Sequence, residues 1–314
     1  MQVIRDLNSF TAPEIAIVTQ GTFDGVHAGH RQILGNIVKI AKQKGGKSIL
    51  VTFHPHPRHV LYKTENTLKL LTTFDEKIEL LSDIGIDYLI VLPFDENFSK
   101  MEAHQFIREI MVNHLGVNTM VVGYDHRFGR NREGSFEDLQ EYAHMFGFEV
   151  IEIAAHDIEH ATVSSTKIRH SLLEGDVETA ALFLGRAYAL NGTVIHGRKM
   201  GKDLGYPTAN LHVANDDKLI PANGIYAVKV EHDKQVYGGM MSIGNNPTIQ
   251  GAKWSIEVHI FDFNRDIYGE DIKITFVKKM RNEEKYADIG LLMKQLKADE
   301  IEARTILNTT DHSV

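Results

Sequence analysis

The sequence predicts an α/β domain with a doubly wound parallel sheet, followed by an all-β domain that ends in a helix. Up to about residue 155, short apolar runs alternate with segments of helical period, and strands that alternate with helices form βαβ units. Beyond Gly185 the chain alternates apolar and polar residues, with Gly and Asn at the joints, which is typical of an antiparallel barrel or sandwich. The 314 residues are enough for two cores. We expect the domains to be residues 1–184 and 185–314.

Five apolar runs are the expected strands of the first domain: residues 15–19, 48–53, 88–94, 119–123 and 149–155. A helix is expected after the first run, because Ile33, Leu34, Ile37, Val38 and Ala41 share one face at helical spacing. Further helices are predicted over residues 74–85, 103–116 and 136–147, each ending at a glycine.

In the second half, residues 164–185 predict two short helices that follow a serine N-cap and are separated at Gly175 and Asp176. The alternating strands are residues 191–197, 223–230, 235–244, 253–263 and 270–279. Residues 288–307 return to helical period and predict the terminal helix.

Composition excludes several classes of protein. The net charge of −8 argues against a general binder of nucleic acid or membrane surfaces, which needs a large positive field. The longest apolar stretches are too short to cross a bilayer, and the N-terminus has no secretory signal. The absence of cysteine excludes disulfides and cysteine nucleophiles. We expect a cytoplasmic protein that acts on small molecules and needs no obligate protein partner.

The segment GTFDGVHAGH, residues 21–30, predicts a phosphate site directly after the first strand. A glycine-rich turn there lets backbone N–H groups approach phosphate oxygens, and the following helix directs its positive end at them. His27 and His30 are one helical turn apart, so both can face one ligand and stabilise charge on a departing pyrophosphate. Taken singly, each histidine is better explained as a surface or capping residue, and only the complete string favours function.

A second phosphate-binding segment is predicted at SSTKIR, residues 164–169. Ser165 and Thr166 lie at a helix start and Arg169 lies one turn further, so hydroxyls, amides and a guanidinium group can converge on phosphates. Taken alone, this segment is more readily explained as a helix N-cap.

The segment GYPTAN, residues 205–210, predicts a cation site in the second domain. Thr208 and Asn210 project to the same side of an extended segment, and their oxygens suit a hard cation such as Mg²⁺. Gly201 and Lys202 precede them in a glycine- and lysine-containing stretch that can wrap a triphosphate. An ordinary Pro-Thr turn would explain the motif better if it stood alone.

Glu257 lies in an alternating strand, opposite in parity to Ile256 and Val258. A carboxylate facing a barrel interior is costly unless it has a task, but the same parity equally allows a solvated outer face.

Six segments, in this order, resemble the bacterial bifunctional riboflavin kinase/FMN adenylyltransferase family: residues 21–30, 51–61, 121–134, 163–186, 197–211 and 267–281. HAGH also resembles the HxGH signature of the nucleotidyltransferase superfamily. The resemblance implies a Rossmann-like nucleotidyltransferase domain followed by a riboflavin kinase type of β-barrel. It implies that ATP and Mg²⁺ are used to phosphorylate riboflavin to FMN, and that a second ATP adenylylates FMN to FAD with release of pyrophosphate.

The resemblance also implies roles for single residues of the first domain. The ATP site would contain Gly21, Phe23, Asp24, His27, His30 and Asp125, with Ser165, Thr166 and Arg169 closing over the phosphates. His126 replaces a more usual aromatic residue. The flavin would be bordered by His54, Pro55, His56 and Pro57. A metal site at His54, His56 and His59 is not expected, because prolines restrict the loop and no carboxylate is adjacent.

In the second domain, the resemblance implies that Glu257 is the general base for the ribityl 5′-hydroxyl. Thr208 and Asn210 would bind metal and nucleotide, with Gly201 and Lys202 around the triphosphate. Arg281 would lie near the flavin or phosphate, and the Asn245–Asn246 loop stands where the family often has an arginine.

Three alternatives stay open. The chain could be a single-function FAD synthetase with a silent kinase domain. It could be a flavin-binding module without turnover, which would predict damaged phosphate-binding residues. A cytidylyltransferase or tRNA synthetase relative would leave the C-terminal barrel unexplained.

Overall fold

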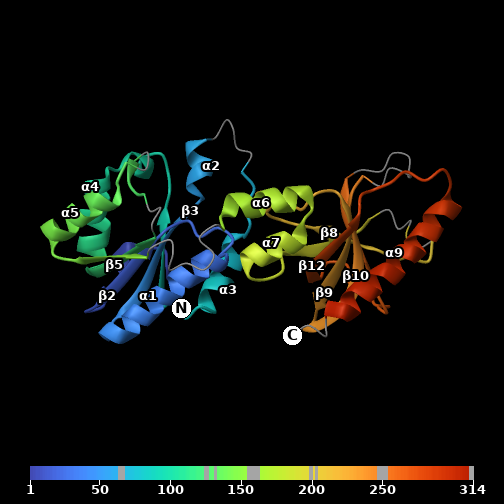
Figure 1. Cartoon of the computed structure of the whole chain (residues 1–314), viewed down its shortest axis with the longest axis horizontal. Helices are drawn as coiled ribbons and strands as arrows, with labels where there is room; N and C mark the ends of the chain where they lie inside the picture. The colour runs from blue at the N-terminus through green and yellow to red at the C-terminus, as the bar shows by residue number, and fades with distance from the viewer. Residues whose placement is uncertain are drawn as a thin grey trace. The chain divides into compact units, whose positions relative to one another are not determined.

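The computed structural model describes residues 1–62, 68–123, 127–130, 133–153, 163–197, 201, 204–245 and 254–310. It divides the chain into two compact units, Met1–Ser165 and Thr166–Val314, which Figure 1 draws from blue to red along the chain. No helix among these residues is long and apolar enough to cross a membrane.

The first unit is built on a six-stranded sheet in which all neighbouring strands are parallel, in the order β1-β4-β3-β2-β5-β6. The strands are β1 (Gln2–Ile4), β2 (Ala16–Gln20), β3 (Lys47–His54), β4 (Tyr88–Pro93), β5 (Val117–Gly123) and β6 (Glu149–Ile153). The predicted parallel sheet is confirmed. The strand β1 is not predicted from the sequence, because a strand of three residues is too short to show an apolar period.

Helices cover both faces of this sheet, which is the doubly wound arrangement that the sequence predicts (Figure 1). They are α1 (Ala28–Lys44), α2 (Pro57–Leu61), α3 (Phe74–Ser82), α4 (Ala103–Phe106), the π-helix η4 (Ile107–His114) and α5 (Phe136–Phe146). On one face, Leu50 and Leu89 pack with Leu34 of α1 and Leu81 of α3. On the other face, residues of α4, η4 and α5 pack against alternate residues of the same strands.

The second unit is a closed barrel with the strand order β10-β11-β8-β7-β12-β9, in which every pairing is antiparallel. Its strands are β7 (Ala189–Ile195), β8 (Ala209–His212), β9 (Gly224–His232), β10 (Gln235–Gly244), β11 (Ser255–Ile260) and β12 (Asp271–Arg281). The sequence left a barrel or a sandwich open, and the structure shows the barrel.

In the part of the chain that the structure describes, the helices that accompany the barrel are α6 (Ser165–Glu174), α7 (Val177–Leu184) and α9 (Ile289–Thr310). The amide of Ala222, just before β9, donates to Leu172 O of α6, so from Thr166 onward these helices group with the barrel. The terminal helix α9 places Ala303 and Leu307 against Ala227 and Met240 of the barrel wall. The functional boundary at residues 184/185 stays a prediction.

Candidate active sites

The turn after β2 lies at the point where the strand order of the sheet reverses. From β2 the chain proceeds to β3 and β4 on one side and later to β5 and β6 on the other, so the loops leave the carboxyl ends of β2 and β5 in opposite directions. In open α/β sheets, ligands bind in the crevice at such a point. Residues 21–27 follow β2 and thus occupy the expected place. Asp125 and His126, which follow β5, lie outside the described residues.

This turn has an unusual backbone. Phe23 and Val26 have φ values of 46° and 39°, and Gly25 lies between them at 84°. Non-glycine residues with positive φ are strained and cluster at functional sites, where the surrounding structure holds them in place. Here the Val26 amide donates to Phe23 O over 3.1 Å, which closes a tight loop just before α1.

His27 and His30 form a stacked pair at the start of α1. Their ring centroids are 3.5 Å apart, and His27 Nδ1 accepts a hydrogen bond from the His30 amide over 3.3 Å, so His27 caps the helix. Burial, the His27 ring and the Lys77 ammonium hold the pKa of His30 well below its ordinary value. These surroundings therefore disfavour the protonated form of His30. The helix N-terminus offers the setting in which phosphate would favour the charged form.

Asp24 anchors the turn rather than facing an open space. It is 2% exposed, and its carboxylate accepts hydrogen bonds from the amides of Leu71 and Thr72 at 3.1 to 3.2 Å. Ser165 Oγ donates to the backbone oxygen of Asp24 over 3.0 Å. The structure thus joins two of the predicted segments, the turn and the start of α6. Thr166 and Arg169 belong to the second unit, and their convergence on the histidines stays a prediction.

Lys77 is a candidate functional residue that the sequence motifs do not include. It is 7% exposed, and its Nζ donates to Thr22 O within the turn over 2.7 Å. A signal was available in the sequence, since Lys77 precedes the buried Leu81 by four residues and therefore lies on the core-facing side of α3.

The predicted flavin-binding segment follows β3, the neighbour of β2, at the same edge of the sheet. The His54–Pro55 peptide bond is cis, and Pro57 occupies the first turn of α2, where His56 Nδ1 accepts from the Arg58 amide. Burial, followed by the charges of Arg5 and Lys77, lowers the pKa of His54. Flavin binding by His54, Pro55, His56 and Pro57 stays a prediction.

In the barrel, the predicted residues Thr208, Asn210 and Glu257 lie together. Thr208 Oγ1 donates to Glu257 Oε2 over 2.9 Å, and Ser255 Oγ donates to Glu257 Oε1 over 3.0 Å. Asn210 is the strand partner of Glu257 between β8 and β11. A hydroxyl, an amide and a carboxylate are all oxygen donors, and this set suits a hard cation such as Mg²⁺.

The register of the barrel shows which face Glu257 occupies. Its neighbours Ile256 and Val258 pair with the buried Ile243 and Met241, whose side chains fill the interior. Glu257 instead pairs with Ser242 and shares the outer face, where α9 packs further along the strands. A half-buried outer position avoids the cost of placing a carboxylate in the barrel core.

Two glycines, Gly197 and Gly201, lie in close contact with the segment that leads into β8. A side chain at Gly197 would overlap the Asn210 amide, and one at Gly201 would overlap Tyr206 O. The Tyr206 amide donates to Gly201 O over 2.8 Å, which holds Gly201 beside the predicted cation ligands. Lys202 and Asn246 lie outside the described residues. Asn245 begins the loop after β10, and its amide donates to Glu283 Oε2 over 3.2 Å.

Arg281 makes a forked ion pair with Asp299 of α9. Its Nε and a terminal nitrogen lie 2.9 and 2.6 Å from the two carboxylate oxygens, and Asp299 is 1% exposed. Although burial disfavours the charged form, the hydrogen bonds to Asp299 raise the pKa of Arg281. The contacts seen for Arg281 thus join β12 to α9, while its role near the flavin stays a prediction.

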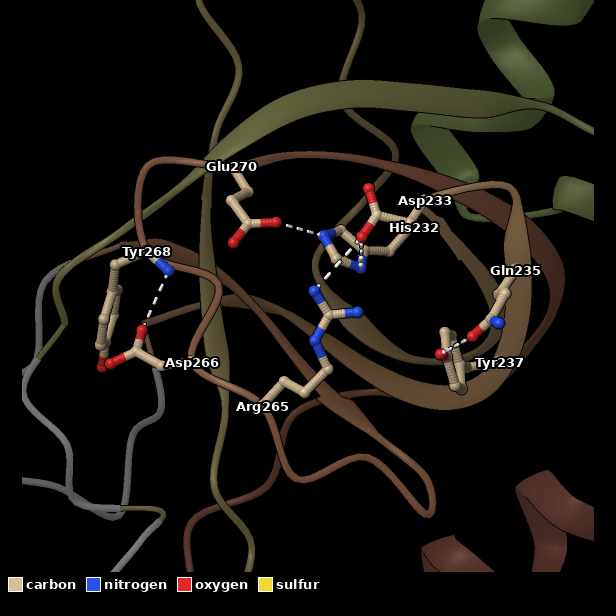
Figure 2. A network of polar contacts seen from close by, with 8 residues as sticks. All are labelled: His232, Asp233, Gln235, Tyr237, Arg265, Asp266, Tyr268 and Glu270. Carbon is tan, nitrogen blue, oxygen red and sulfur yellow. Dashed lines mark hydrogen bonds and ion pairs between the residues drawn. The ribbon is translucent and has the colours of Figure 1, made fainter.

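A further polar network lies at the β9–β10 hairpin (Figure 2). His232, Asp233 and Glu270 have potential ligand atoms within 4.8 Å of one another. However, His232 Nε2 bonds Glu270 Oε2 at 2.6 Å, while its Nδ1 lies 3.8 Å from Asp233 Oδ2, and Arg265 already pairs with Asp233. Because the two ring nitrogens face different carboxylates, we interpret this network as a structural link between the hairpin and the loop before β12.

Comparison with known proteins agrees with the geometry of both units. The FAD synthetase family matches residues 10–167, and the riboflavin kinase family matches residues 184–307. The bifunctional riboflavin kinase/FMN adenylyltransferase of Bacillus subtilis (strain 168) is 37% identical over 292 residues, covering 92% of this chain and 91% of the relative. The protein of that name from Escherichia coli (strain K12) is 34% identical over 313 residues, covering 99% of both chains.

The chain belongs to the bifunctional riboflavin kinase/FMN adenylyltransferase family. A crystal structure from Streptococcus pneumoniae, described as a macrolide-efflux protein, has the same fold over 96% of this chain and 98% of its own, with a TM-score of 0.85 and 33% identity. In the chain described here, the first matched region contains the stacked histidines His27 and His30, and the second contains the hydrogen-bonded pair of Thr208 and Glu257.

Proposed function

We propose that this chain phosphorylates riboflavin to FMN in its barrel unit and adenylylates FMN to FAD in its α/β unit, using one ATP for each step. The observation that supports both activities, rather than one, is the hydrogen bond between Thr208 and Glu257 opposite Asn210. A silent kinase domain would have no need to keep a hydroxyl, an amide and a carboxylate together on one face.

In the adenylyl transfer, a phosphate oxygen of FMN attacks the α-phosphorus of ATP, and pyrophosphate leaves. Negative charge grows on the pyrophosphate, and donors that are already in place stabilise it most effectively. His27, His30 and the backbone amides at the start of α1 supply such donors. Ser165, Thr166 and Arg169 would hold the remaining phosphate oxygens, with Gly21 and Phe23 shaping the turn and Asp24 anchoring it.

In the phosphorylation, Glu257 takes the proton of the riboflavin 5′-hydroxyl as the oxygen attacks the γ-phosphorus of ATP. Thr208 can both orient Glu257 and bind a cation, because a hydroxyl that donates its hydrogen to the carboxylate keeps lone pairs for the cation. Thr208 and Asn210 would hold Mg²⁺, which neutralises charge on the ATP phosphates, and Gly201 and Lys202 would lie along the triphosphate.

The partners proposed are therefore small molecules only: ATP, riboflavin and FMN, with no nucleic acid, no membrane and no obligate protein partner. The decisive experiment is incubation of the purified chain with riboflavin, ATP and Mg²⁺, followed by chromatographic separation of riboflavin, FMN and FAD over time. FMN that rises first and FAD that follows would support the proposal. Conversion of added FMN to FAD without any phosphorylation of riboflavin would favour the single-function alternative.

A further inference from the structure

We propose that Lys77 is a positioning residue for adenylyl transfer, which fixes the Thr22 carbonyl and places a buried positive charge beside the phosphate-binding turn. This inference rests on the function proposed for the histidine site and adds to it a residue of α3, outside the motifs from which that site was predicted.

The local structure directs Lys77 inward. Thr73 and Glu76 form a capping box that fixes the first turn of α3, and Lys77 is the next residue. Its stem is buried together with Leu81 on the same side of the helix. The Nζ atom reaches the backbone oxygen of Thr22 at 2.7 Å, directly before the residues with positive φ. Lys77 therefore holds the residue that directly precedes the strained part of the turn.

Among the residues that the structure describes, Lys77 forms no ion pair with a carboxylate. An ammonium group has three donors, and one hydrogen bond, to Thr22 O, is seen for it within the described part of the chain. The nearest influential carboxylate, Asp24, is bound by the amides of Leu71 and Thr72. Burial lowers the pKa of Lys77, and Asp24 partly offsets this effect. Since a buried cation without an anion is costly, this arrangement favours the binding of an anion nearby.

The charge of Lys77 affects two histidines, His30 and His54. The positive charge of Lys77 contributes to the lowered pKa of His30, at the end of the turn after β2, and to that of His54, at the end of β3. The groups that bear on His30 are the His27 ring, the Phe23 ring edge and Lys77. Lys77 thus lies within electrostatic reach of both the proposed phosphate site and the proposed flavin site, where the two substrates must meet.

The test separates the charge from the hydrogen bond. Lys77→Met removes both, whereas Lys77→Gln removes the charge and retains a donor for Thr22 O. Lys39→Gln removes an exposed lysine charge from α1 and is the matched control. For each variant we would measure kcat/KM for ATP in FAD formation and the pKa of His30 by NMR titration. Riboflavin phosphorylation by the same chain serves as an internal control for protein concentration and for the folding of the barrel unit, whereas the NMR spectrum reports on the folding of the first unit.

We expect Lys77→Met and Lys77→Gln to lower kcat/KM for ATP in FAD formation by about 10²-fold, which is typical of losing a fixed charge or donor at a reacting phosphate. In both variants the pKa of His30 should rise, and phosphorylation should stay within about twofold. Lys39→Gln should leave all of these values unchanged.

A Lys77→Gln variant with normal kcat/KM and an unshifted pKa of His30 would overturn the proposed role of the charge, even if Lys77→Met failed to fold. The variant His30→Ala separates this failure from failure of the proposed function. If His30→Ala abolishes FAD formation while Lys77→Gln is normal, only the inference about Lys77 is wrong. If His30→Ala is itself normal, the proposed adenylyl transfer site is wrong.

Discussion

Thr208 Oγ1 and Glu257 Oε2 lie 2.9 Å apart and join the residue just before β8 to the outer face of β11. The sequence assigned these residues separate roles, one as a cation ligand and the other as a base. Their hydrogen bond makes the two roles interdependent, because the hydroxyl hydrogen that Thr208 donates occupies one oxygen of Glu257. The other oxygen accepts from Ser255, so the carboxylate is held in one orientation.

Replacing Glu257 with Gln should slow riboflavin phosphorylation by about 10²–10⁴-fold, the usual effect of removing a general base. The amide oxygen can still accept hydrogen bonds, but the group cannot take a proton. Initial rates of FMN formation provide the measurement, and Glu231→Gln, an exposed carboxylate on β9, is the matched control. Near-normal FMN formation by the Glu257 variant would remove this residue from the mechanism.

The variant His30→Ala should abolish FAD formation from FMN and leave FMN formation from riboflavin largely intact. The reason is that the ring stacked on His27 belongs to the first unit, whereas Thr208 and Glu257 belong to the second. Both rates can be followed by chromatography in one reaction. The control His144→Ala, which changes an exposed residue of α5, should leave both unchanged. An equal loss of both activities in the His30 variant would contradict the separation of the sites.

The pKa of His30 should lie below its ordinary value of about 6.5 in the free protein and should rise when ATP binds, because phosphate favours the imidazolium form. A base with a lowered pKa binds its proton less readily in the folded state than in the unfolded state. Its contribution to stability is therefore complete above pH 6.5 and decreases as the pH falls from there toward the folded pKa. NMR titration of the histidines with and without ATP measures both effects. A free-protein value at or above 6.5 would contradict the proposed environment.

The sequence predicts those features that depend on local spacing. The turn after β2, the two histidines one helical turn apart and the alternation in β11 are all local, and the structure places them as their patterns require. Lys77 and Arg281 are different, since what they contact depends on which elements pack together. A helical period could place Lys77 on the buried side of α3, but only the fold brings it to Thr22 O. Similarly, the pairing of Arg281 with Asp299 requires α9 to lie along the barrel.

The alternation of apolar and polar residues in β11 also could not show whether Glu257 lies inside or outside the barrel. Alternation separates two faces of a strand without saying which is interior, and the pairing of Ile256 and Val258 with buried residues of β10 decides it.

Replacing Thr208 with Val should raise the Mg²⁺ concentration needed for half-maximal FMN formation by about tenfold or more, the scale seen when groups that support a metal site are lost. Val has the shape of Thr but offers no oxygen to a cation. A Mg²⁺ titration of the phosphorylation rate provides the measurement, and chelation with EDTA should abolish the reaction. Thr193→Val, on neighbouring β7, is the control. An unchanged Mg²⁺ dependence in the Thr208 variant would exclude its hydroxyl as a ligand.

The ion pair between Arg281 and Asp299 should contribute strongly to the stability of the barrel unit. Asp299 is buried, and its carboxylate also accepts a hydrogen bond from Gln295. Asp299→Asn should therefore lower the free energy of unfolding by about 3 kcal/mol, because it leaves the buried part of the Arg281 guanidinium without its counter-charge. The control is Asp262→Asn, which breaks the pair of Arg304 with a carboxylate that is 79% exposed and should change the stability far less, because water screens an exposed ion pair. Urea unfolding followed by the fluorescence of the single tryptophan, Trp254, reports on this unit alone. Equal losses in the two variants would show that the burial of Asp299 does not determine the strength of its pair.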